Sequence, residues 1–190
     1  MPKSFEPTVL ETARVKLRFV EERDVDAVYA VYSDPVVARY LSRPAQTDRA
    51  EAVKMVGNIL AGYGDGSSVA FAMERREDGV VMGIVMLFRM HEESRRAEIG
   101  YSMARAYWGQ GYMDESLRTA IDYAFGPMNL NRLEADIDPR NVSSAKSLVR
   151  LRFKAEGVLR ERWIVSGEVS DTAYYGLLRA EWIDNAKHAS

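Results

Sequence analysis

The run Trp108-Gly109-Gln110-Gly111-Tyr112-Met113 combines residue types that suit the binding of a phosphate. Its small residues leave backbone N–H groups uncovered just before a segment with the pattern of a helix. The N-terminus of a helix carries partial positive charge and unpaired N–H donors, so a phosphate can bind there. The alternative is a tight turn that binds nothing. A dinucleotide loop is excluded because Asp114 stands where its third glycine would be, and the Gly-Lys-Ser/Thr of a Walker loop does not occur.

This loop is expected to join a strand to an amphipathic helix. Apolar and polar residues alternate from Ala97 to Met103, which is typical of a strand buried on one face. After the loop, apolar residues recur every three or four positions, at Met113, Leu117, Ala120, Ile121 and Ala124. Gly126-Pro127 then ends the predicted helix.

The remaining periodicity predicts an α+β fold. We expect further strands at 15–19, 69–74, 80–89, 133–137, 162–165 and 169–178. Helices are expected at 24–32, as a short turn at 35–40, and after a cap at Ser143 or Ser144. Another helix is expected from Asp48 to a glycine-rich end, Gly62, Gly64 and Gly66, with its inward residues at Val53, Val56, Ile59 and Leu60. This order predicts a mixed sheet with helices on both faces, in a single domain over residues 1–190 with a core of about 12–182.

Composition excludes several classes of site. The 190-residue chain has no cysteine, so a disulfide, a thiolate metal site and a cysteine nucleophile are excluded. His91 and His188 are its only histidines, which disfavours a metal site and a serine–histidine–aspartate hydrolase. The net charge of −2 gives no reason to expect nucleic acid or an anionic membrane as a partner. With no apolar signal region or membrane span in the sequence, we expect a cytoplasmic protein.

Several short motifs occur in one order along the chain. The glycine loop is followed by Arg132-Leu133-Glu134-Ala135, by Asp138-Pro139-Arg140-Asn141-Val142-Ser143-Ser144, by Phe153 to Arg160, and by a closing run from Gly176 to Trp182. Together they resemble the GCN5-related N-acetyltransferases, and within them the RimJ/RimL-type branch that acetylates ribosomal-protein N-termini. Three residues depart from the pattern: Met113 in the loop, Arg152 where the branch has glycine, and Trp163 near the position of a catalytic glutamate. Trp108 departs from the wider family's loop but is common in the branch.

The resemblance implies a mostly antiparallel, splayed sheet and acetyl-CoA as the cofactor. The loop residues would contact its pyrophosphate, namely Trp108, Gly109, Gln110, Gly111, Tyr112, Met113 and Asp114. The strand end Tyr101-Ser102-Met103 would carry the pantetheine arm, with the Met103 N–H as a donor to the oxyanion. Asn141 would hold the carrier from the other side of the splay.

Acetyl transfer to an amine also needs a base, because an alkyl ammonium is mostly protonated at neutral pH. Glu98 is the first candidate, and an ion pair with Arg95 or Arg96 on the solvent face is its alternative; Glu134 is the second candidate. By resemblance Ser144 would protonate the departing thiolate, and its alternative role is a helix cap alone.

Two functions remain open from the sequence. The first is an acetyl-CoA-dependent N-acetyltransferase in which an amine, from a protein N-terminus or a small molecule, attacks the thioester directly in a ternary complex. Tyr40 and Trp163 are expected to bind that acceptor. The second is a non-catalytic acyl-CoA-binding or sensing protein. The apolar final strand, with Leu177 and Leu178, suggests a homodimer.

Overall fold

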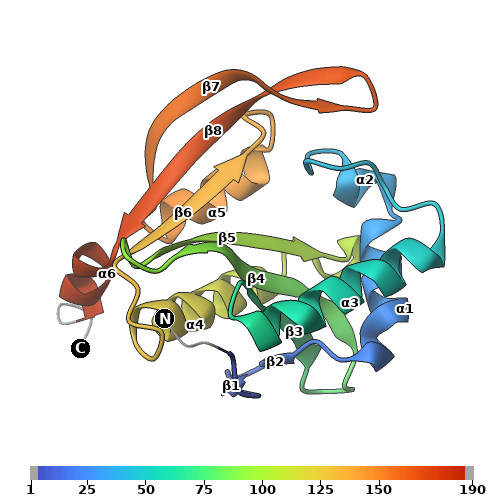
Figure 1. The fold of residues 1–190 in the computed structure, drawn as a ribbon, viewed down its shortest axis with the longest axis horizontal. Coiled ribbons are helices and arrows are strands. Elements are labelled where there is room, and N and C mark those ends of the chain that lie inside the picture. Colours follow the sequence, from blue (N-terminus) through green and yellow to red (C-terminus); the bar gives the residue numbers. More distant parts are fainter. Residues whose placement is uncertain (1–3, 187–190) are drawn as a thin grey trace.

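Eight strands form one mixed sheet in the order β1-β2-β3-β4-β5-β6-β8-β7 (Figure 1). The computed structural model describes residues 4–186. The strands are β1 Val9–Glu11, β2 Val15–Phe19, β3 Val69–Arg75, β4 Val81–His91, β5 Arg96–Met103, β6 Arg132–Ile137, β7 Lys154–Val165 and β8 Glu168–Leu178. Neighbouring strands are antiparallel except β5 and β6, which run parallel.

The parallel pair is hydrogen-bonded only at one end. Its ladder joins Arg96–Glu98 to Arg132–Glu134, whereas β5 continues to Met103 and β6 to Ile137. The sheet therefore divides into one arm of β1 to β5 and another of β6, β8 and β7, which diverge beyond Glu98 and Glu134 (Figure 1). The expected mixed, mostly antiparallel and splayed sheet is confirmed.

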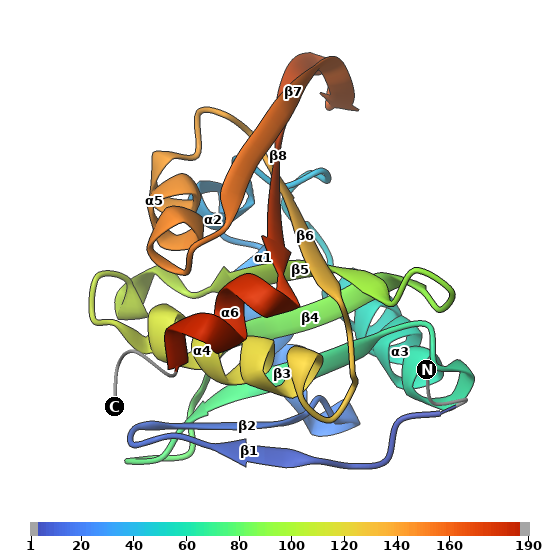
Figure 2. The same ribbon diagram turned by 90° about the vertical axis from the view of Figure 1, so that its left-hand side faces the viewer.

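Helices cover both faces of the first arm. The helices of the described chain are α1 Val25–Tyr32, α2 Pro35–Ala38, α3 Arg49–Asp65, α4 Tyr112–Phe125, α5 Val142–Arg150 and α6 Arg179–Ala186, with 3-10 turns at Glu22–Asp24 and Arg105–Tyr107; α5 lies beside the second arm (Figure 1). In Figure 2, α4 and α6 lie in front of the strands and α1 and α3 behind them. The predicted inner face of α4 is buried at Leu117, Ala120, Ile121 and Ala124, and it packs into one core with Phe71, Leu87 and Leu133. Burying the larger of these side chains, such as Leu117 and Ile121, stabilises the fold by about 1.5–3 kcal/mol each.

The prediction for α3 was wrong in two details. Val53 is 48% exposed, so the inner face consists instead of Ala52, Met55, Val56 and Ile59. The helix also continues through Gly62 and Gly64 and ends only at Gly66, whose φ is 71°. A Cβ at Gly62 would come within 2.1 Å of the Ser68 hydroxyl, so a larger residue there would require Ser68 to shift.

The outer hairpin is longer than the sequence pattern predicts. β7 begins at Lys154 rather than near Arg162, and its register with β8 shifts between Ala155 and Gly157 and again between Leu159 and Trp163. Nearly all of β7 is exposed, so its residues show no alternation of burial that could mark a strand. The short strand β1 and the helix α6 were also not predicted.

Candidate active site

The free edge of β5 presents backbone donors to the opening between the arms. In the antiparallel ladder with β4, the Ala104 N–H donates to the Met82 carbonyl at 2.8 Å. Since N–H groups of successive strand residues point to opposite edges, those of Tyr101 and Met103 point away from β4. No strand of the described chain pairs with this part of the edge. The Ser102 side chain lies near Tyr32 of α1, where it lowers the pKa of Tyr32, which burial raises.

The α4 helix begins with uncapped N–H groups. Its N-cap is Gly111, at φ 85°, and Gly109 has φ 72°, so both glycines adopt the left-handed conformation that other residues rarely take. No side chain caps the helix, and the first intrahelical bond runs from the Glu115 N–H to the Gly111 carbonyl at 3.1 Å. The N–H groups of the first turn are therefore available to an anion.

Other side chains of the loop fix its shape. The Trp108 indole N–H donates to the Met103 carbonyl at 2.7 Å, and the Gln110 amide donates to the Ala106 carbonyl at 2.9 Å. Tyr112 is buried under the Arg14 guanidinium, 4.6 Å from its ring centre. Met113 packs against the core, which accommodates its departure from the family pattern. These side chains hold the backbone that the sequence assigns to phosphate.

Two arginines surround the first turn of α4. The Asp114 carboxylate accepts from Arg118 Nε at 2.9 Å and from Arg150 Nε of α5 at 2.8 Å. Burial raises the pKa of Asp114, but the two guanidiniums outweigh it and hold the pKa below its usual range. Both arginines are about half exposed. Two cations against one carboxylate leave excess positive charge beside the helix N-terminus.

The start of α5 corrects the predicted cap. Asn141, not Ser143 or Ser144, is the N-cap, and its Oδ1 accepts from the Ser144 N–H at 3.1 Å. Ser144 stands in the first turn, close enough to Tyr101 of β5 to lower its pKa, although the buried Tyr101 hydroxyl has no hydrogen-bond partner in the described structure. Burial raises the pKa of Tyr101 to about 12, against the lowering effect of Ser144. The structure thus brings Tyr101, Asn141 and Ser144 together.

A cavity of about 450 Å³ lies at the mouth of the opening. Its walls come from the segment around α2, from β4 and β5, and from β6, α5 and the tip of the β7–β8 hairpin, which stand opposite one another in Figure 1. Tyr40 and Trp163, which we expected near the acceptor, both line it, as do Tyr101, Asn141 and Ser144. The glycine loop is not part of its lining.

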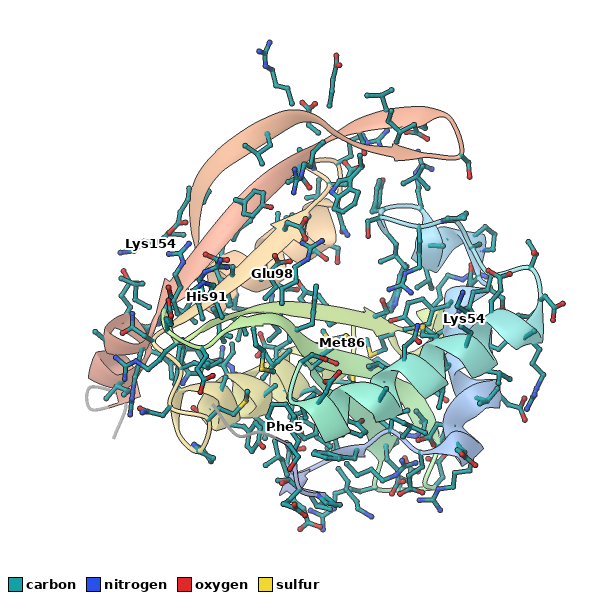
Figure 3. All side chains as sticks on the ribbon, viewed as in Figure 1. Phe5, Lys54, Met86, His91, Glu98 and Lys154 are labelled. Atoms are coloured by element: carbon teal, nitrogen blue, oxygen red, sulfur yellow. The ribbon has the colours of Figure 1, made fainter. Side chains whose placement is uncertain are left out.

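Glu98 lies at the base of the opening, where the β5–β6 ladder ends (Figure 3). It is 6% exposed, and both its carboxylate oxygens accept from Arg89 Nη1, at 3.0 and 2.9 Å. The alternative for Glu98, an ion pair with Arg95 or Arg96 on a solvent face, was wrong. Arg89 reaches Glu98 because it sits in an irregularity of the β4–β5 ladder with φ 49°, which redirects its side chain.

The environment of Glu98 favours its protonated form. Burial raises the pKa of Glu98, Arg89 lowers it, and the charges of Asp136 and Glu134 raise it again, so the pKa stands above its ordinary value. Glu98 itself does not line the cavity, but Phe88 and Gly100, its neighbours on the same sheet face, do. A carboxyl group with a raised pKa is suited to accept a proton near neutral pH.

Glu134, the second candidate base, is held by two arginines. It accepts from Arg132 Nε at 2.8 Å and from Arg96 Nη1 at 2.9 Å. Two residues further along β6, Asp136 lines the cavity, and its Oδ2 is buried without a hydrogen-bond partner in the described structure. Sequence reasoning missed Arg89 and Asp136, although the alternation of Glu134 and Asp136 placed both carboxylates on one side of β6.

Comparison with known proteins identifies the family. Residues 14–154 match the model of the acetyltransferase (GNAT) domain. The chain belongs to this family. The uncharacterized N-acetyltransferase p20 of Bacillus licheniformis is 35% identical over 91% of this chain and 97% of its own length. The ribosomal protein uS5-alanine N-acetyltransferase of Escherichia coli is 25% identical over 91% of this chain and 92% of its own. A solved RimL ribosomal alpha-N-protein acetyltransferase in complex with coenzyme A superposes with a TM-score of 0.83 at 19% identity, covering 90% of this chain and 98% of that one.

The acetyltransferase uses acetyl-CoA, and the geometry of this chain fits that group. An unpaired strand edge meets an uncapped helix N-terminus, as an extended arm ending in a pyrophosphate requires. Within the described residues there is no cluster of three acidic or histidine side chains that could hold a metal ion. His91 is exposed at the end of β4 and accepts from the Ser94 N–H, while His188 lies outside the described residues. None of the helices in residues 4–186 has both the length and the apolar character needed to cross a membrane.

Proposed function

We propose that this acetyltransferase transfers the acetyl group directly to the N-terminal amine of a protein or peptide in a ternary complex. The observation that carries the proposal is the opening between β5 and β6. One side offers unpaired backbone donors and an uncapped helix, and the other side leads into a cavity lined by Tyr40 and Trp163. Cofactor and acceptor can then meet at Tyr101, which lines the cavity together with Asn141.

The proposed roles follow from these positions. Bound acetyl-CoA supplies an activated thioester. The N–H groups at the start of α4 hold its pyrophosphate, with Arg118 and Arg150 adding positive charge, and the Asn141 amide retains both its N–H donors because only its oxygen caps α5. The Met103 N–H donates to the carbonyl oxygen that gains charge during transfer. Glu98 accepts the amine proton through water, and Ser144 gives a proton to the departing sulfur.

A peptide acceptor is favoured over a small amine by a second cavity of about 470 Å³. It shares Arg43, Met86 and Phe88 with the first cavity and extends toward α3. Gln46 lines it and is 6% exposed, and its Oε1 has no hydrogen-bond partner in the described structure. This oxygen can accept from a main-chain N–H of an extended acceptor. The name of the Escherichia coli relative supports the same class of acceptor, and such a substrate would place the reaction in the cytoplasm.

The test is thiol release from acetyl-CoA with peptides of increasing length and with small amines. We expect kcat/KM to rise from a single amino-acid amide to a tetrapeptide amide, and Gln46→Leu to reduce that rise while leaving the single amide unaffected. Equal rates for all lengths would overturn the peptide assignment. Tight binding of acetyl-CoA without turnover of any amine would instead support the non-catalytic alternative.

A further inference from the structure

Among the carboxylates at the end of the β5–β6 ladder and along β6, one makes no hydrogen bond or ion pair in the described structure. Glu98 is bound by Arg89, Glu134 by Arg96 and Arg132, and Asp138 by Arg140 at 2.6 Å. Asp136 lies among them, yet no side-chain hydrogen bond or ion pair involves it in the described chain, and its Oδ2 is buried. A buried charged oxygen without a partner costs free energy unless a ligand or water satisfies it.

Asp136 faces the space where an acceptor must bind. It lines the cavity together with Ser144, Tyr101 and Trp163. It is also close enough to Glu98 and Arg89 for its charge to raise the pKa of both. An amine bound at Asp136 therefore lies close to Glu98 of β5, the carboxyl group proposed as the base.

The other charged residues that line the cavity also favour an acceptor bound with its amine toward β6. Arg39 and Arg43 line the wall around α2 and form no ion pair among the described residues, although the charge of Arg39 lowers the pKa of Asp138. Arg140 binds Asp138 and Glu168. The cavity thus has negative charge on β6 and positive charge on the opposite wall. A cation enters such a cavity with its positive end toward β6.

We propose that Asp136 is the positioning residue that binds the acceptor's ammonium group by a charged hydrogen bond before the proton is removed. This inference rests on the proposed function, since it names the residue that selects a cationic amine at that site. Its consequence is that the protein distinguishes a free N-terminus from the same peptide already acetylated, which releases the product after transfer.

The experiment measures binding, so that it does not depend on turnover. Calorimetry compares the peptide amide Ala-Ala-Ser-Gly-NH2 with its N-acetylated form, with and without saturating coenzyme A. We expect the wild-type protein to bind the free amine at least about ten-fold more tightly, as a charged hydrogen bond allows, and Asp136→Asn to reduce the difference to about two-fold or less. Asp136→Glu should retain part of it. Glu6→Gln, which removes an exposed carboxylate outside the cavity, is the matched control and should behave as wild type.

Two results would overturn the assignment: wild-type protein that binds both peptides equally, or Asp136→Asn that still prefers the free amine ten-fold. The first needs no variant and so stands even where Asp136→Asn does not fold. In turnover assays Asp136→Asn should raise the KM of the peptide by about ten-fold with little change in kcat, which a general loss of structure would not produce. Failure of the wild-type protein to bind coenzyme A would overturn the proposed function and leave the amine comparison readable.

Discussion

Glu98 combines burial, which raises its pKa, with a guanidinium that lowers it. If it is the base, activity falls as the pH drops through its pKa, because only the carboxylate accepts a proton. Glu98→Gln should lower kcat by about 100-fold or more at neutral pH. Arg89→Gln should move the acidic limb of the kcat profile to higher pH, since Arg89 is the group that lowers this pKa. Profiles of both variants with an N-terminal peptide check this. If neither variant changes the pH of the acidic limb of the kcat profile, Glu98 has a structural role alone.

Gly111 tests the phosphate site at a single residue. Its φ of 85° strains any larger residue, and a Cβ there would stand 3.2 Å from the Arg14 guanidinium. Gly111→Val should weaken acetyl-CoA binding, measured by calorimetry, while the domain stays folded. Gly167→Val is the matched control, because Gly167 has φ 84° with nothing within 4 Å, in the turn between β7 and β8. If both variants lose affinity equally, strain and not the loop is responsible.

At the scale of the elements, the periodicity of apolar residues predicted the faces that pack in the core. It did not predict features that depend on local backbone geometry. The buried face of α4 and the strand before it follow directly from apolar spacing. The partner of Glu98 could not be predicted, because in a regular ladder Arg89 and Glu98 would point to opposite faces, and only an irregularity brings them together. The cap of α5 was misplaced because three residues within one turn, Asn141, Ser143 and Ser144, all have suitable side chains.

The end of α5 explains why the family pattern has glycine where this chain has Arg152. The Phe153 N–H donates to the Leu148 carbonyl and the Arg152 N–H to the Val149 carbonyl, both at 2.9 Å, which is a Schellman motif. That motif places Arg152 at φ 71°, a conformation that favours glycine. Leu148 and Phe153 are both buried and complete the motif.

Arg152→Gly should therefore stabilise the protein by up to about 1 kcal/mol, because it removes left-handed strain from a residue whose side chain is exposed. Arg152→Val should destabilise it, since a β-branched residue tolerates this φ least. Urea denaturation of the two variants measures both changes. A loss of stability in the glycine variant would show that the arginine side chain contributes more than its backbone costs.

At the scale of the whole molecule, the two arms are joined by a short strand ladder and by ion pairs. Only three residue pairs link β5 to β6, and beside them Glu134 holds Arg96 of one arm and Arg132 of the other. Arg132 also binds Glu156 of β7, so the ion pairs reach the outer hairpin. The short ladder and these ion pairs therefore hold the two arms together at one end of the opening. The charged residues at this junction lie next to the site. The first arm has a separate buried network, which ties its helical layer to the sheet.

That network should make stability depend on acid pH. Arg18 of β2 is buried and binds Asp24 before α1 at 2.7 Å and Glu74 of β3 at 2.6 Å. Burial raises the pKa of both carboxyl groups, but Arg18 outweighs it and holds both pKa values below their usual range. As the pH falls below about 4, the unfolded chain binds protons before the folded one does, so the stability present at neutral pH is lost progressively.

Asp24→Asn removes one of these carboxylates and leaves Arg18 incompletely paired in the interior. We expect it to lower the free energy of unfolding by about 3 kcal/mol at pH 7. Its stability should also fall less steeply in acid, by up to about 1.4 kcal/mol per pH unit, because one proton fewer is taken up on unfolding. Asp26→Asn is the matched control, since Asp26 makes an exposed ion pair with Arg49, and its denaturation curves should follow those of the wild type. Urea titrations between pH 2.5 and 7, at about half-unit steps across the range of carboxyl titration, measure both effects. An Asp24→Asn curve parallel to the wild type throughout would mean that Asp24 is not ionised in the folded protein.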